Sequence, residues 1–206
     1  MAAIGKSLMF YLKYYSEMTQ LYEEEKSLPE VEHHADLELI KKKVNAVGDA
    51  ACIEAATLLE ACVSDLQARL ATIESLKLKS PKTSTVQKSW QLKLDLRTPS
   101  KDEEGKYVRQ IGIYLDNGGL FPWVWCRGGL EAEEKIISCF PQGVECSSSR
   151  KMGWGGGGTV GLATVPVPWE SAKDFNLEAD DIIKRARKVF EDAITRKFLD
   201  KYMTLG

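Results

Sequence analysis

The spacing of apolar residues changes near residue 80 of this 206-residue chain. Before that point apolar residues recur every three or four positions, which predicts helices, and after it they alternate with polar residues, which predicts strands. The composition changes at the same place: residues 23–89 contain no Phe, Tyr or Trp, whereas all five Trp and thirteen of the sixteen Gly lie in residues 90–169. The pattern predicts an α+β protein in three parts: a helical hairpin or coiled-coil arm (1–79), a linker (80–89) and a small sheet domain (90–206).

Two helices are predicted in the arm, at residues 7–26 and at about 29–78. The second helix follows Ser-Leu-Pro-Glu at 27–30, which can form a capping box with a proline in the first turn. It carries apolar residues at the three- and four-residue spacing of a coiled coil. The central residues of this row, called the seam below, are Val44, Val47, Ala51, Ala55, Leu58, Cys62, Leu66 and Leu70.

The length of the second helix predicts a further packing partner. At 1.5 Å per residue it would extend for roughly 70 Å, so the shorter first helix can cover less than half of it. An exposed apolar row of that size is disfavoured in water. Two occupants fit the remaining part of the seam: the C-terminal helix of the same chain, or a second copy of the chain, which would make a homodimer.

The remainder of the chain predicts a mixed or antiparallel sheet with one short helix and a long C-terminal helix. In residues 90–97, Trp and Leu alternate with polar residues, as in a half-buried strand. Asp-Asn-Gly-Gly at 116–119 is a strong hairpin turn, and Pro122 predicts an edge position or a bulge. Further strands are predicted at 107–115, 120–126 and 160–167, and helices at 130–140 and from 176 onward.

The bulk composition favours a cytoplasmic protein without a cofactor or a metal. The net charge is −2 and the hydrophobic content 44%, so there is no general attraction to nucleic acid or to anionic membranes. No apolar run of about 18 residues and no secretory signal pattern are visible. The five cysteines contain no Cys-x-x-Cys, which indicates reduced thiols. The only two histidines, His33 and His34, are adjacent and cannot easily share one metal ion on a helix.

No catalytic triad can be assembled from these residues, and we expect no enzyme. The order helix, three strands, helix, one or two strands, helix is also that of the PD-(D/E)xK nuclease fold, whose carboxylates hold Mg²⁺ beside a lysine on consecutive strands. Asp116 is suitably placed for this chemistry. Glu133 and Lys135 supply the other two residue types, but on the predicted helix. A divergent, inactive nuclease-like protein is therefore kept as an alternative.

Aromatic and glycine-rich segments of the sheet domain predict a binding surface. Trp123 and Trp125 share one face of their strand, either in the core or at an interface. Residues 153–158 match G-x-G-x-x-G without the strand before and the helix after that a dinucleotide site needs, so they form either a hairpin tip or a binding loop. We expect a regulatory interaction protein that binds another protein, with a nucleic-acid-binding module as the alternative. The predicted contact residues are Trp123, Trp125, Arg127, Arg150, Lys151 and Trp154.

Overall fold

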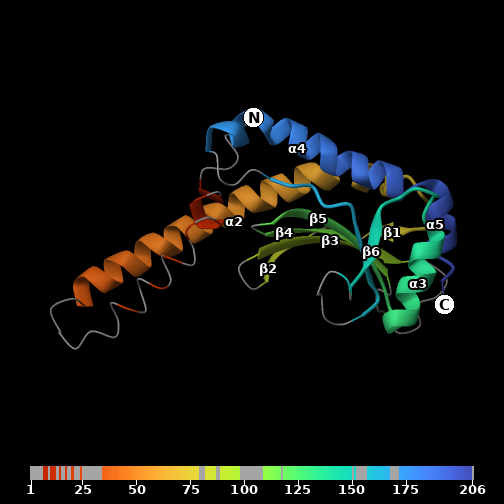
Figure 1. Cartoon of the computed structure of the whole chain (residues 1–206), viewed down its shortest axis with the longest axis horizontal. Helices are drawn as coiled ribbons and strands as arrows, with labels where there is room; N and C mark the ends of the chain where they lie inside the picture. The colour runs from red at the N-terminus through yellow and green to blue at the C-terminus, as the bar shows by residue number, and fades with distance from the viewer. Residues whose placement is uncertain are drawn as a thin grey trace.

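The computed structural model describes most of the chain and shows an α+β fold with helices over one face of an antiparallel sheet (Figure 1). The described residues are 34–78, 82–86, 89–97, 109–116, 118–149, 151, 157–167 and 172–205, together with Ser7, Leu8, Phe10, Tyr11, Leu12, Tyr14, Glu17, Gln20 and Glu24. The nine N-terminal residues of this set are all helical.

The long helix of the predicted arm is present but shorter than its pattern predicts. Helix α2 (His34–Ala71) is one continuous helix of 38 residues. Its last turn tightens, because the amides of Thr72 and Ile73 donate to the carbonyl groups of Arg69 and Leu70. The prediction of helix up to residue 78 is therefore wrong, since strand β1 (Lys77–Leu78) follows.

The sheet has seven strands in the order β1-β3-β4-β5-β7-β6, and all its pairings are antiparallel. Strand β2 also pairs with β3, on the edge that β1 shares, so the predicted linker is wrong across the residues that form β2. The remaining strands are β2 (Lys82–Val86), β3 (Ser89–Arg97), β4 (Arg109–Asp116), β5 (Gly119–Cys126), β6 (Cys146–Ser148) and β7 (Thr159–Leu162).

The hairpin predicted at 116–119 sets the register of the central strands. Asp116 pairs with Gly119, and the ladder continues to Arg109 opposite Cys126. On its other side, β5 pairs through Val124–Val160 and Leu120–Val165. Between these two pairs the partner segment has one residue more than β5. Pro122 lies in this interval, where a bulge tolerates its missing N–H group, as the sequence predicted.

One face of the sheet and the inner sides of the helices form a single core. Leu92, Ile113 and Val124 represent the three central strands on this face, and each is fully buried. Helix α4 (Ala172–Ala193) lies beside α2 over this face, and α3 and α5 lie at the end of the sheet (Figure 1). The bounds of the last two are α3 (Gly129–Cys139) and α5 (Arg196–Tyr202).

Most of the seam is buried inside the chain itself. Six of its members are at most 3% exposed and belong to the same core as the strands: Ala51, Ala55, Leu58, Cys62, Leu66 and Leu70. A second chain could reach these six side chains only by displacing the sheet or α4. Val47 is half-buried, and the side chain of Val44 lies outside the described set. The predicted division into an arm and a separate sheet domain therefore does not match the packing. The predicted homodimer contact is also wrong for the six residues from Ala51 to Leu70, because they pack inside their own chain.

The N-terminal helical residues also join this core. Leu8 is fully buried, and its amide donates to Glu54 of α2 at 2.8 Å. The ring of Tyr11 lies 5.3 Å from that of Trp90, measured between centroids. Because Tyr11 also lies beside Gly48, Leu8 and Tyr11 follow α2 in the direction opposite to its own chain direction.

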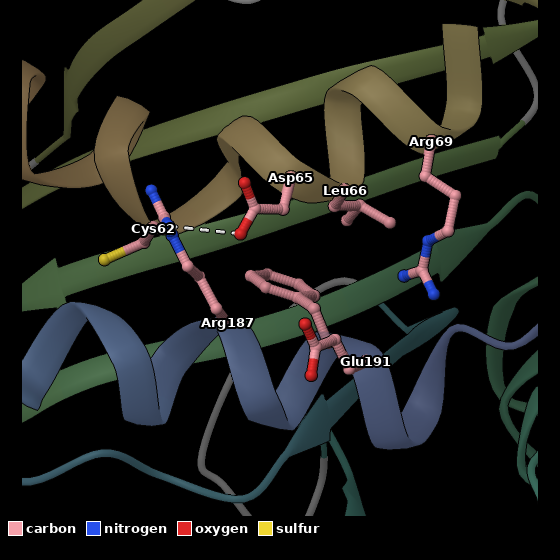
Figure 2. A pocket seen from close by; sticks show the side chains of 7 residues that line it. Cys62, Asp65, Leu66, Arg69, Arg187 and Glu191 are labelled. Carbon is pink, nitrogen blue, oxygen red and sulfur yellow. Dashed lines mark ion pairs between the residues drawn. The ribbon is translucent and has the colours of Figure 1, made fainter. Parts of the chain in front are cut away.

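Arg187 joins the two helices that cover the sheet. Its Nε donates to the carbonyl oxygen of Ala61 at 3.0 Å, and one Nη donates to Ser64 Oγ at 2.9 Å. The other Nη lies 3.1 Å from Asp65 in an ion pair (Figure 2). Since Asp65 is mostly exposed, water screens the ion pair, and the bonds to Ala61 and Ser64 are the more persistent link.

We expect Arg187→Ala to lower the free energy of unfolding by about 1 kcal/mol, because two hydrogen bonds between helices are lost. The matched variant Asp65→Asn keeps those bonds and should change stability by no more than about 0.5 kcal/mol. Urea titrations monitored by circular dichroism measure both values. An equal loss in the two variants would show that the ion pair, and not the pair of hydrogen bonds, links α2 to α4.

Candidate functional site

The face of the sheet opposite the core is the candidate site. Along β3 the burial alternates from Trp90 to Arg97, so every second side chain points away from the helices. Trp123 is the one buried hydrophobic residue of the described chain that does not belong to the core. We call this side of the sheet the open face, and its members are Gln91, Lys93, Asp95, Arg97, Gln110, Gly112, Tyr114, Asp116, Phe121, Trp123 and Trp125.

Trp123 forms the floor of the open face. Its register partners on both neighbouring strands are glycines, Gly112 on β4 and Gly161 on β7. A Cβ atom placed on Gly112 would come within 2.6 Å of Trp123 Cε2 and within 2.7 Å of the carbonyl oxygen of Leu92. The indole therefore lies over the backbone of β4, where it is only 6% exposed. This arrangement explains why a glycine stands in the middle of a central strand.

Other aromatic side chains flank this floor. Tyr114 and Phe121 are register partners, and their rings meet edge to face with centroids 6.3 Å apart. Tyr114 also accepts a hydrogen bond from Ser89 at 2.7 Å. On the other side of Trp123, Trp125 pairs in register with Gln110, which donates to Asp95 at 2.7 Å. Partly buried aromatic groups thus lie in a row, with fixed polar groups beside them.

The row is held from beneath by the end of the chain. Tyr202 of α5 is fully buried, and its hydroxyl donates to the carbonyl oxygens of Trp125 and Gln110 at 2.5 and 3.2 Å. Arg109 Nε donates to the carbonyl oxygen of Tyr202 at 2.7 Å. Burial raises the pKa of the Tyr202 hydroxyl well above its ordinary value, so it stays protonated and remains a donor even in alkaline solution. The β4–β5 pair below the aromatic row is therefore rigidly supported.

The predicted contact residues are only partly brought together. Trp123 and Trp125 share the open face, as predicted, whereas Arg127 and Lys151 are exposed near the end where β5 stops and β7 begins. Arg150 and Trp154 lie outside the described residues. The sequence reasoning missed Tyr114, although the register of the hairpin turn places it opposite Phe121.

The glycine-rich segment has a structural role where it is described. Cys126 donates from its amide to the carbonyl oxygen of Gly158 at 3.0 Å. Gly158 has a φ of +79°, and a Cβ atom there would overlap the backbone carbonyl oxygen of Cys126. The close approach of two backbones therefore requires glycine at this position.

The residues of the nuclease alternative do not converge. Asp116 precedes β5 and Glu133 follows it on α3, so the eight-residue strand separates them by roughly 23 Å. Asp116 accepts a hydrogen bond from the amide of Gly118, and burial raises the pKa of its carboxyl. Glu133 is buried and accepts from Ser149, whereas Lys135 is exposed. The predicted nuclease constellation is therefore wrong, and the described residues contain no cluster of three potential metal ligands.

A cavity between α2 and α4 is too small for a metabolite-sized ligand (Figure 2). Its volume is about 110 Å³. The lining residues are Cys62, Asp65, Leu66, Arg69, Arg187, Phe190 and Glu191. Burial raises the pKa of the Cys62 thiol to about 12, and Arg187 offsets this only in part. The thiol therefore stays protonated and is a poor nucleophile.

Comparisons with models of protein families, with curated proteins and with solved structures found no match to this chain. Within the described ranges, no helix combines the length and the apolar character that crossing a membrane requires.

We expect Gly112→Ala to destabilise the protein by about 1–3 kcal/mol, because the added methyl group must displace the Trp123 indole or the β3 backbone. The matched control is Gly48→Ala in α2, where a new Cβ would meet Tyr11 at 3.4 Å, an ordinary contact. That variant should be neutral, or stabilising by up to about 1 kcal/mol, because alanine favours helix. Urea denaturation and tryptophan fluorescence report both effects. Equal stability of the two variants would contradict the packing of Trp123 over Gly112.

The raised pKa of Cys62 predicts a loss of stability in alkali. The unfolded chain ionises this thiol near pH 9, whereas the folded chain keeps it protonated up to about pH 12. The contribution is therefore complete below pH 9 and declines as the pH rises toward 12. Between pH 9 and 10.5 the wild type should lose stability more steeply than Cys62→Ala, by up to about 1.4 kcal/mol per pH unit. Identical slopes in urea titrations of the two proteins would refute the shift.

Proposed function

We propose that this chain is a cytoplasmic, non-enzymatic regulatory protein that binds another protein through the open face of its sheet. The observation that carries the proposal is the aromatic row of Tyr114, Phe121 and Trp125 around Trp123, which is buried over Gly112. Such side chains are partly buried on a sheet face that lies away from the core. Aromatic groups at the centre of a surface are typical of the residues that contribute most to protein binding.

The charges around the aromatic row favour a protein as the partner. Lys93 and Arg97 carry positive charge on this face, and Asp95 and Asp116 carry negative charge. An aromatic centre with a rim of both signs resembles the composition of protein interfaces. Burial raises the pKa of the thiols of Cys62, Cys126, Cys139 and Cys146, so these four side chains are poor nucleophiles at neutral pH.

The rigidity of the open face would assist binding. Trp123 is held between glycines, Gln110 is hydrogen-bonded to Asp95, and Tyr202 supports the strands from the core side. A surface that is already ordered loses little conformational entropy when a partner binds. The side chains that would give up most of their remaining exposure are Phe121 and Trp125.

A nucleic-acid-binding module is the second candidate. Aromatic residues on the central strands of an antiparallel sheet can stack against unpaired bases, as in common RNA-binding sheets. The carboxylates of Asp95 and Asp116 on the same face oppose this, because they would repel phosphate groups. Binding of single-stranded homopolymers that weakens steeply with added salt would favour this candidate over a protein partner.

Site-specific photo-crosslinking tests the proposed protein partner. A photoreactive phenylalanine analogue at Phe121 should capture a discrete protein in cells of the source organism, and Trp125→Ala should reduce the captured amount at least tenfold. The same analogue at Ile137, an exposed apolar position of α3, is the matched control and should capture no such protein. Circular dichroism checks that all variants fold. Equal capture from both positions, or none from Phe121, would contradict a partner on the open face.

A further inference from the structure

Helix α2 carries a second apolar row, on the side that points away from the core. Among the described residues, Ile53 and Leu39 are the two most exposed large hydrophobic side chains, at 69% and 50%. They lie fourteen residues apart, with the exposed Ala46 midway between them. A seven-residue spacing keeps side chains on nearly one line along a helix. We call Leu39, Ala46 and Ile53 the outer stripe.

The outer stripe is distinct from the buried seam. At 100° per residue, Ala46 and Ile53 lie roughly opposite Ala51 and Ala55, which are fully buried. The N-terminal helix occupies a different side of α2, because Leu8 binds Glu54 and Tyr11 lies beside Gly48. Figure 1 shows the N-terminal half of α2 projecting beyond the edge of the sheet. The side chains of Leu39, Ala46 and Ile53 are all exposed.

We propose that the outer stripe binds the same stripe of a second copy of the chain, with the two helices antiparallel. A two-fold axis at Ala46 places Leu39 of one copy against Ile53 of the other, because both lie seven residues from the axis. Ala46 is small, so the helices can approach closely where the axis crosses them. Each of the two large apolar side chains then loses much of its exposure in the dimer.

The charges beside the stripe favour the antiparallel orientation. Lys42 and Asp49 are exposed on one flank of the stripe, four residues before and three after Ala46. In the antiparallel pair, Lys42 of each copy lies beside Asp49 of the other, which gives two opposite-charge contacts. In a parallel pair the flank that carries Lys42 and Asp49 in one copy lies on the opposite side of the interface from that flank in the other copy, so these contacts would not form. No described residue forms an ion pair with either of them within the chain.

The contact uses one face of one helix, so it is small. It lies below the roughly 800 Å² per partner of a standard stable interface. The proposal therefore predicts a reversible dimer whose population rises with concentration, and not a permanent one.

Sedimentation equilibrium of the full chain, over a concentration range of about a hundredfold, tests this proposal. The wild type should shift from monomer toward dimer, and Ile53→Lys should weaken the association at least about tenfold. The matched control Ile137→Lys also places a lysine on an exposed apolar position, and it should associate like the wild type. A wild type that stays monomeric throughout, or an Ile53→Lys variant that still dimerises normally, overturns the proposal.

A charge exchange tests the orientation and separates it from simple destabilisation. Lys42→Glu and Asp49→Lys should each weaken the dimer, because each places like charges together. The double variant should regain most of the wild-type association, since opposite charges are again paired. Failure of the double variant to recover, with native circular dichroism, overturns the antiparallel arrangement. Because the open face lies elsewhere, crosslinking from Phe121 should continue in Ile53→Lys, so the two proposals fail independently.

Discussion

Burial of one face of an antiparallel sheet beneath α2 and α4 is the constraint on which the other contacts depend. Fully burying one large apolar side chain contributes roughly 1.5–3 kcal/mol, and Leu92, Ile113 and Leu58 are all completely buried in this layer. Trp90 connects the parts, because its Nε1 donates to Cys52 of α2 at 3.1 Å and its ring contacts Tyr11. The N-terminal segment, the long helix and the strands therefore stabilise one another as a single unit.

When helices cover only one face of a sheet, the side chains of the other face must be compatible with contact with water or with a binding partner. Here the central position of that side is filled by Trp123, which lies over Gly112 and is only 6% exposed, with the half-buried Phe121 and Trp125 on either side of it. Polar groups around it are held by hydrogen bonds, such as that between Gln110 and Asp95. The apolar surface that Phe121 and Trp125 still expose to water costs free energy, and this cost would be recovered if a complementary partner covered it. That is the physical basis for proposing that a partner binds the open face.

The sequence predicted the helices and strands in which apolar residues recur at a regular spacing. The alternation after Trp90 and the turn before Gly119 are both confirmed. Strands β1 and β2 were missed because they join the edge of β3 through backbone hydrogen bonds, and polar residues such as Thr83 and Ser84 leave no hydrophobic pattern there. The spacing of the seam residues predicted that one side of α2 is buried. It could not show whether a sheet or another helix covers that side, because both kinds of packing need the same three- and four-residue spacing. Likewise the alternation along the strand placed Trp123 and Trp125 on one face, whereas the position of Tyr114 beside Phe121 required the strand register.

The two surfaces of the molecule lie on opposite sides of the helix layer, and this has a consequence for binding. The seam directs one side of α2 into the core, so the outer stripe around Ile53 points away from the sheet. A dimer formed through the stripe would leave both open faces uncovered. Two linked faces engage a repeated or dimeric partner at a raised effective concentration, so even a weak dimer contact and modest affinity per face can combine into strong binding. A transient dimer would then be favoured by the partner itself, because binding to both faces stabilises only the associated form.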